Sequence, residues 1–131
     1  MRVNVTANWR LMRALEPLLR RSDAARALFV TSNAAHNSPA FMGAYAASKA
    51  ALDTLARIWA VENAKSSLKV NLLDPGAVGT RMRAQYKPGE DASRLRGPAD
   101  LGDAFVRLCA PANDRTGETF LFSERRWLDR D

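Results

Sequence analysis

Apolar residues recur at three- and four-residue spacing in several parts of this chain, and that period predicts amphipathic helices. The pattern predicts a first helix over 4–21 and a longer one over about 43–64. A third helix is predicted over 97–109, with Pro98 at its first position, where the fixed φ of proline is already helical. A short helix is also predicted near 80–85.

Three short apolar runs between these helices have the length of buried strands. They are RALFVTS (26–32), LKVNLL (68–73) and ETFLF (118–122). The first run is followed by a polar loop, NAAHNSP, and the second by Asp74-Pro75-Gly76, which is turn chemistry. Strands that alternate with helices are joined by right-handed crossovers, which make the sheet parallel and put helices on its faces. We therefore expect an α/β fold with a parallel sheet of about three strands.

Length and composition narrow the class of protein. With 131 residues, 47% of them hydrophobic, the chain is expected to form one globular domain over 1–131. A single cysteine, Cys109, excludes an internal disulfide and suits a reducing compartment. A single histidine, His36, excludes a metal motif with two histidines and is expected to be solvated in its polar loop. No apolar run approaches the ~18 residues of a membrane span, so we expect no metal, no membrane segment and a cytoplasmic location.

The chain is also basic, with a formal net charge of +6. Such an excess permits an anionic partner without requiring one. The arginines stand in scattered pairs such as Arg20-Arg21 and Arg125-Arg126, and neither an aromatic platform nor a recognition helix accompanies them. We therefore expect no nucleic-acid partner.

Candidate chemistry begins with Tyr45 and Lys49, which stand four residues apart at the start of the long predicted helix. Residues at this spacing lie on one helical face, so the phenol and the ammonium can be neighbours. A nearby cation favours the phenolate, which lets a tyrosine exchange a proton with a substrate as a general acid or base. The spacing alone is common by chance, and its alternative is an exposed tyrosine beside a solvated lysine. The surrounding residues therefore decide between the two.

Those residues gather at one predicted edge of the sheet. Ser32 ends the first predicted strand, and the segment 71–80, NLLDPGAVGT, carries the end of the second strand and the loop after it. Ligand sites of open α/β sheets form at the carboxyl ends of strands. Asn4 stands near the start of the first helix, upstream of Tyr45.

In order and spacing, these motifs resemble the C-terminal half of a short-chain dehydrogenase/reductase, from Asn4 to about Phe122. In that family a serine, a Tyr-x-x-x-Lys and an upstream asparagine form the catalytic set, and P-G-x-x-x-T follows the next strand. The resemblance implies a Rossmann-like, doubly wound sheet and hydride transfer between NAD or NADP and a small carbonyl or alcohol substrate. The matching catalytic residues are Asn4, Ser32, Tyr45 and Lys49, and the matching cofactor-binding residues are Tyr45, Lys49, Pro75, Gly76, Val78 and Thr80.

The resemblance also implies a role for each catalytic residue. Tyr45 would donate a proton to the carbonyl oxygen during reduction and remove it from the alcohol during oxidation. Lys49 would favour the phenolate and hydrogen-bond the nicotinamide ribose. Ser32 would polarise the substrate carbonyl, and Asn4 would hold a water that links Lys49 to solvent.

The cofactor half of the family's pattern is matched only in part. The Val78 backbone and the Thr80 side chain would hold the nicotinamide carboxamide. The seven glycines contain no counterpart of the family's T-G-x-x-x-G-x-G turn, and its N-N-A-G motif is absent as well. By this comparison the first four of the family's seven strands are missing, which leaves 26–32 at an open edge.

On that basis we expect the chain alone to be inactive, as a truncated product, a mis-assigned start or a fragment. The alternative is a catalytically silent remnant that acts at most as a packing or oligomerisation module. The family also implies a possible homo-oligomer through the first and long helices. Trp9 and Trp59 would be interface candidates there, and Trp59 is a core candidate too.

Overall fold

The computed structural model describes residues 1–128 of the chain. Its elements are η1, a π-helix (Arg2–Ala7), α1 (Asn8–Leu19), β1 (Arg26–Val30), α2 (Ala34–Asn37), α3 (Gly43–Glu62), β2 (Lys69–Asp74), α4 (Arg81–Tyr86), the short 3-10 helices η2 (Ala92–Arg94) and η3 (Pro98–Leu101), α5 (Gly102–Leu108), β3 (Thr119–Leu121) and β4 (Arg126–Trp127). As far as β3, strands alternate with helical segments as the periodicity predicts.

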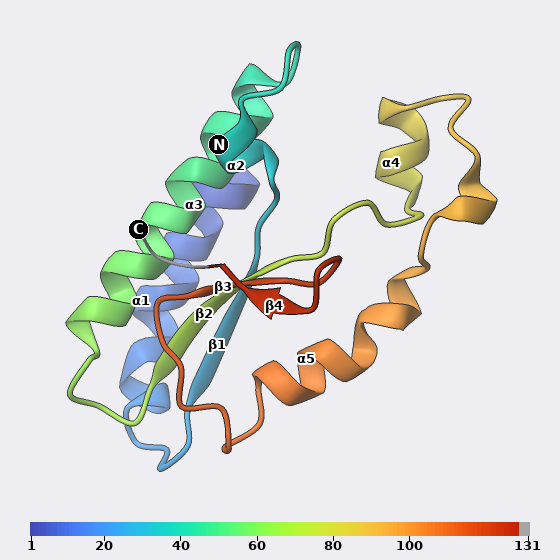
Figure 1. The fold of residues 1–131 in the computed structure, drawn as a ribbon. Helices are drawn as coiled ribbons and strands as arrows, with labels where there is room; N and C mark the ends of the chain where they lie inside the picture. The colour runs from blue at the N-terminus through green and yellow to red at the C-terminus, as the bar shows by residue number, and fades with distance from the viewer. Residues whose placement is uncertain (129–131) are drawn as a thin grey trace.

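The strands form one sheet in the order β1-β2-β3-β4 (Figure 1). β2 pairs in parallel with β1 and with β3, and the register sets Val30 opposite Leu73 and Leu73 opposite Phe120. The sheet has one strand more than expected, because β4 pairs antiparallel with β3. This two-residue strand lies in a charged segment without an apolar run. It is held instead by backbone pairing and by Trp127, whose ring meets Phe120 edge-on at 5.4 Å.

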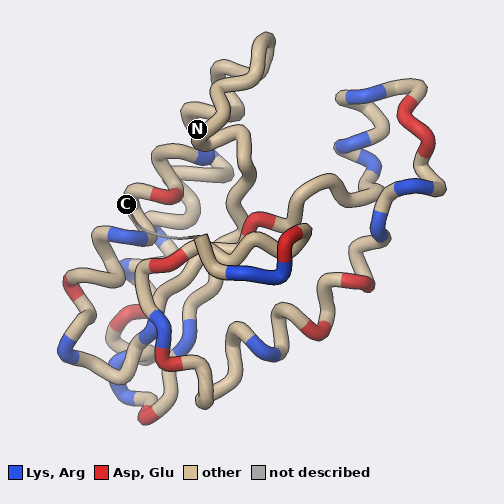
Figure 2. The backbone as a smooth tube through the Cα atoms, in the orientation of Figure 1, with Lys and Arg blue, Asp and Glu red and all other residues tan. Residues whose placement is uncertain are grey.

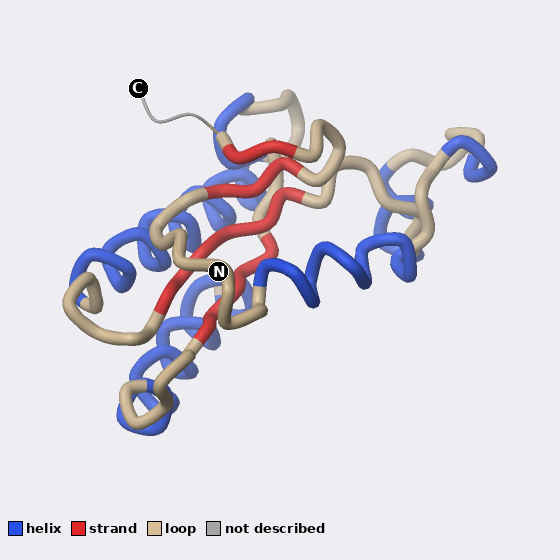
Figure 3. Tube along the Cα trace, turned by 60° about the horizontal axis from the view of Figure 1, so that its bottom comes forward, coloured by secondary structure: helices blue, strands red, loops and turns tan. Residues whose placement is uncertain are grey.

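Helices cover both faces of the sheet. α1 and α3 lie on one face and α5 on the other (Figures 1 and 3). β2 is buried on both sides, as expected of a central parallel strand. Its alternate side chains enter two clusters. The cluster under α1 and α3 includes Met12, Ala56, Trp59, Leu68, Val70 and Leu72. The cluster under α5 includes Leu73, Leu108 and Phe120.

One expectation needs correction. The polar segment after β1 is not all loop, because α2 forms one helical turn there and packs against α3. Of the two alternatives for Trp59, the core position is confirmed, since the side chain is only 5% exposed and meets Phe29 edge-on at 6.2 Å. Trp9 is 44% exposed and stays available to a partner.

Charge is distributed over all layers of the molecule. Figure 2 shows basic and acidic positions interspersed along most elements, with several basic positions in α4 and the segment after it. α4 and that segment, 87–97, stand away from the sheet beyond the end of β2 (Figure 1). Among the described residues no helix is long and apolar enough to cross a membrane.

Candidate active site

Tyr45 and Lys49 lie together near the beginning of α3, whose many alanines let it approach the sheet closely. The Lys49 Nζ atom is 5.9 Å from the centroid of the Tyr45 ring. The same ammonium donates a hydrogen bond of 2.9 Å to the carbonyl oxygen of Val30 at the end of β1. Burial lowers the pKa of Lys49 from its ordinary value, and the charge of Asp53 partly offsets that effect. The pair therefore stands at the carboxyl edge of the sheet, where the sequence places it.

Asn4 reaches α3 one residue away from Lys49. Its Nδ2 atom donates to the Ser48 hydroxyl at 3.0 Å, and that hydroxyl donates to the Tyr45 carbonyl oxygen at 2.7 Å. Ser48 is buried, so the chain of two hydrogen bonds fixes η1 against the first turns of α3. Among the described residues no direct hydrogen bond joins Asn4 to Lys49, and the water-holding role of Asn4 stays a prediction.

Ser32 stands in the turn between β1 and α2. Its hydroxyl accepts a hydrogen bond of 3.3 Å from the Ala34 amide, just before the helical turn begins. In the described part of the chain no hydrogen bond links Ser32 to Tyr45 or to Lys49. The fold therefore brings Ser32 to the same sheet edge as the pair, without a hydrogen bond between them among the described residues.

The loop that follows β2 supplies the other predicted residues. Gly76 has a φ of +69°, and its amide donates to the Asp74 carboxylate at 2.9 Å. Val78 is buried and pairs in a single parallel bridge with Arg96, and its carbonyl accepts from the Thr80 amide at 2.9 Å.

Thr80 caps α4. Its hydroxyl accepts from the Arg83 amide at 3.1 Å, which satisfies one free N–H of the helix start. The hydroxyl keeps its own hydrogen as a donor. Thr80 thus presents a donor beside the loop that leaves β2.

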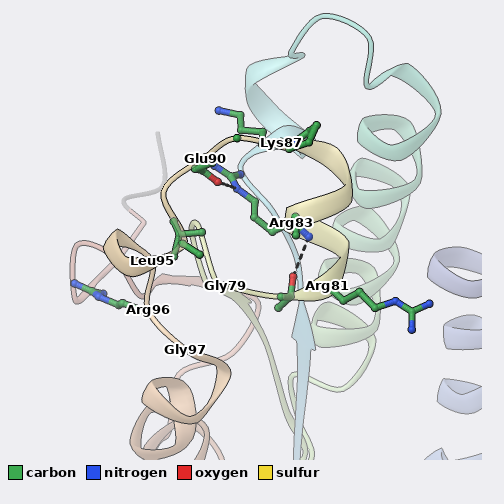
Figure 4. A pocket seen from close by; sticks show the side chains of 13 residues that line it. Gly79, Arg81, Arg83, Lys87, Glu90, Leu95, Arg96 and Gly97 are labelled. Carbon is green, nitrogen blue, oxygen red and sulfur yellow. Dashed lines mark hydrogen bonds and ion pairs between the residues drawn. The ribbon is translucent and has the colours of Figure 1, made fainter.

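Beyond Thr80 the structure contains a cavity of about 490 Å³ between α4 and the segment 87–97. Arg83 and Glu90 form a two-point ion pair across it, at 2.6 and 2.7 Å. Figure 4 shows these two side chains reaching toward each other, while Arg81 and Arg96 point away. The lining residues are Gly79, Thr80, Arg81, Arg83, Ala84, Lys87, Pro88, Gly89, Glu90, Ala92, Leu95, Arg96 and Gly97. The ion pair ties the segment to α4, next to the cofactor residues predicted from sequence.

Beside the Tyr45–Lys49 pair lies a cluster of polar side chains around Asp53 that the sequence analysis did not predict. Asp53 accepts a hydrogen bond from the Thr31 hydroxyl, and its Oδ2 atom lies 3.2 Å from Nε2 of His36. His36 is therefore a partly exposed residue of α2 with a carboxylate neighbour, and the expectation of a purely solvated loop histidine is wrong. The spacing of four residues from Lys49 to Asp53 is the sequence signal that could reveal this cluster. In the described residues no group of three or more acidic, histidine or cysteine side chains could hold a metal ion.

Comparison with known proteins shows the family of the chain. The family model of the short chain dehydrogenases matches residues 1–91. The uncharacterized oxidoreductase YciK of Escherichia coli (strain K12) is 40% identical over 121 residues, which cover 92% of this chain and 48% of that protein. The 2,3-dihydro-2,3-dihydroxybenzoate dehydrogenase of the same strain is 36% identical over 127 residues, which cover 93% of this chain and 51% of that protein.

Solved structures show the same relationship in three dimensions. A short chain dehydrogenase from Salmonella enterica serovar Typhi superposes with a TM-score of 0.88 at 39% identity, covering 92% of this chain and 50% of that one. Another from Escherichia coli CFT073, complexed with NADPH, gives 0.86 at 39% identity, covering 92% and 50%.

The chain belongs to the short-chain dehydrogenase family. Its α/β sheet with flanking helices is the Rossmann-like fold expected from sequence. The chain spans about half the length of the curated relatives it matches.

Proposed function

We propose that this chain carries the catalytic and substrate side of an NAD- or NADP-dependent oxidoreductase that interconverts a small carbonyl compound and its alcohol. The observation that carries the proposal is the Tyr45–Lys49 pair, held at the end of β1 by the hydrogen bond from Lys49 to Val30. Family membership and the solved relative in complex with NADPH support the cofactor class.

The residues of the chain have complementary roles in this reaction. Tyr45 donates its hydroxyl proton to the substrate oxygen in reduction and takes it back in oxidation. The Lys49 ammonium favours the phenolate that remains when the proton has left. Ser32 donates a hydrogen bond to the same substrate oxygen, where negative charge develops. A nicotinamide bound beside these residues would supply or accept the hydride.

The donors present fit the nicotinamide end of such a cofactor. An ammonium has three N–H donors, and among the described residues Lys49 uses one of them, on Val30. The others suit ribose hydroxyls, and the Thr80 hydrogen suits an amide or phosphate oxygen. No described segment forms a glycine-rich strand–helix turn that would cradle a pyrophosphate, so these residues account for the nicotinamide side alone.

Nucleotide titration tests the proposal against the alternative of a silent remnant. NADH and NADPH are titrated into the chain and binding is followed by calorimetry. We expect saturable binding below millimolar concentration, weakened about tenfold or more in Lys49→Met because charge-assisted hydrogen bonds are lost. Lys65→Met, at an exposed lysine after α3, is the control. Heat that never saturates with either nucleotide would favour the remnant.

Two wider expectations belong to the same proposal. A homo-oligomer would bury apolar side chains that α1 and α3 leave exposed, among them Trp9, Leu15 and Ile58 at 44, 44 and 51% exposure. A cytoplasmic location is the other expectation, and the free Cys109 suits such a reducing compartment.

A further inference from the structure

A carboxylate is buried one helical turn beyond Lys49. Asp53 of α3 is only 2% exposed. Its Oδ1 atom accepts a hydrogen bond from the Thr31 hydroxyl. Its Oδ2 atom accepts no hydrogen bond among the described residues, and Nε2 of His36 lies 3.2 Å from it. Burying an ion that is only half satisfied costs free energy, so a residue kept for packing alone would not need to be charged.

The neighbours of Asp53 come from the segments that carry the catalytic residues. Thr31 precedes Ser32 in the chain, and its amide donates to the Leu73 carbonyl oxygen at 2.8 Å, which continues the sheet register beyond β1. His36 stands on α2, the helical turn that begins just after Ser32 and Asn33. Lys49 lies four residues earlier on the same helix. Asp53 therefore contacts one residue before Ser32 and one on the helical turn after it, while it lies on the same helix as the Tyr45–Lys49 pair.

Three basic or titratable groups act on this carboxylate. Desolvation raises the pKa of Asp53, and the charges of Arg57, His36 and Lys49 oppose that rise together with the hydrogen bond from Thr31. The influence is mutual, because the Asp53 charge raises the pKa of Lys49 against the desolvation that lowers it. One N–H group of the Arg57 guanidinium is already used on β3, since the Nη2 atom donates a hydrogen bond of 3.1 Å to the Thr119 hydroxyl.

We propose that Asp53 is a positioning residue of this active site, whose buried carboxylate keeps Lys49 protonated and ties the Ser32 turn to the helix that carries Tyr45. The first role needs the negative charge. The second needs only hydrogen-bond acceptors, so an amide can fill it. Asp53→Asn thus separates the two roles at nearly constant shape. The catalytic consequence rests on the proposed function, whereas the effect on Lys49 does not.

The test measures the protonation of Lys49 directly. Wild type, Asp53→Asn and Glu62→Gln are trace-labelled with acetic anhydride from pH 7 to pH 11, and peptide mass spectrometry gives the rate at each lysine. Glu62 is the matched control because it is an exposed acid on the same helix. The pH at the midpoint of the rate reports the Lys49 pKa, and the alkaline plateau reports access to the amine.

We expect the Lys49 midpoint to move to lower pH in Asp53→Asn. Below the midpoint its labelling should quicken at least about threefold, because an opposite charge nearby is gone. Glu62→Gln should leave the midpoint in place, as should Thr31→Val, which removes the tether but keeps the charge. Lys65 serves as the internal reference in every sample. A Lys49 midpoint that is the same in Asp53→Asn as in the wild type overturns the proposal.

A second experiment measures turnover, so that the role of Asp53 and the proposed function can fail independently. If the chain reduces carbonyl compounds, Asp53→Asn should lower kcat by about tenfold and shift its pH profile, well short of the ~10²-fold or larger loss for the acid/base residue itself. A shifted Lys49 midpoint in a chain without any turnover supports the role of Asp53 and contradicts the proposed function. Turnover with the same kcat and pH profile in Asp53→Asn contradicts the role of Asp53.

Discussion

The Lys49 ammonium and the Val30 carbonyl oxygen, 2.9 Å apart, join α3 to the last residue of β1. The contact spans two segments that the sequence separates by a turn, a short helix and a loop. It fixes the start of α3 against the sheet edge where Ser32 and the loop after β2 also lie. The ammonium thus has a position defined by the fold and retains donors that can bind a ligand.

Lys49→Met should show that this ammonium contributes little to stability at neutral pH. Because burial lowers the pKa of Lys49, the folded chain binds that proton less tightly than the unfolded chain. Burying the protonated ammonium therefore lowers the free energy of unfolding, and this loss is complete at any pH below the Lys49 pKa of the folded chain. As pH rises from the folded-state pKa to the higher pKa of the unfolded chain, the loss disappears. Methionine keeps the apolar part of the side chain and removes the free-energy cost of burying the ammonium.

We expect the free energy of unfolding in urea to change by only about 0.5 kcal/mol at pH 7, since the group is partly exposed and screened. The rise of stability with alkaline pH should be smaller than in the wild type. A loss of about 2 kcal/mol or more at pH 7 would mean that the ammonium is mainly structural.

Gly76→Ala should destabilise the loop that follows β2. Gly76 has a φ of +69°, and an added Cβ would meet the Ser123 Cβ atom at 3.4 Å. A left-handed conformation costs alanine about 1–2 kcal/mol, so the free energy of unfolding should fall by about that amount. Gly43→Ala is the matched control. No atom lies within 4 Å of its added Cβ, and helix propensity should make that variant equal or slightly more stable.

The ion pair of Arg83 and Glu90 should hold the segment 87–97 against α4 in a pH-dependent way. The hydrogen bonds from Arg83 lower the pKa of Glu90 below its ordinary value. A carboxylate whose pKa is lowered by folding stabilises the fold at any pH above its pKa in the unfolded chain. This stabilisation is lost as pH falls through the pKa of the same group in the folded chain. The pair should therefore hold the segment at neutral pH and release it only below the usual pKa of a glutamate carboxyl.

Hydrogen exchange of amides 87–97, corrected for intrinsic rates, measures this release. Glu90→Gln should lower protection at pH 7 to the level that the wild type reaches at pH 3. Glu124→Gln, in the exposed pair with Arg126 at 2.7 Å, is the control. Equal protection in the wild type and Glu90→Gln at pH 7 would show that other contacts hold the segment.

The features that sequence predicts here are those set by local spacing. A spacing of four residues from Tyr45 to Lys49 places both on one helical face. The run 68–73 is short and mostly apolar, which predicts a buried strand. The contact between Thr31 and Asp53 depends instead on how a helix packs on a strand end. The spacing of Lys49 and Asp53 shows only that the two lie on one helical face. It does not show that Asp53 is buried, because a charged position in a helix is typically solvent-facing.

The sequence pattern does not predict two short elements, α2 and β4, for a similar reason. α2 has a single turn made of alanine, histidine and asparagine, and its packing against α3 stabilises it where propensity does not. β4 lies between charged residues and depends on its pairing with β3 and on the contact of Trp127 with Phe120. In both cases tertiary contacts determine the structure, and the local pattern carries no signal of them.

The central claim is that Tyr45 is the proton donor of a nicotinamide-dependent carbonyl reduction. Because the chain alone is expected to be inactive, the claim is tested most directly by turnover of the chain completed upstream with the nucleotide-binding half of a family member, and every variant below is made in that completed chain. Oxidation of NADPH and NADH is followed by absorbance with a panel of aliphatic, aromatic and cyclic aldehydes and ketones. The chain has one other tyrosine, Tyr86 on α4, which provides the matched control. We expect turnover in the wild type and in Tyr86→Phe, and a loss of about 10² or more in Tyr45→Phe. Turnover that persists in Tyr45→Phe at the wild-type rate would contradict the account.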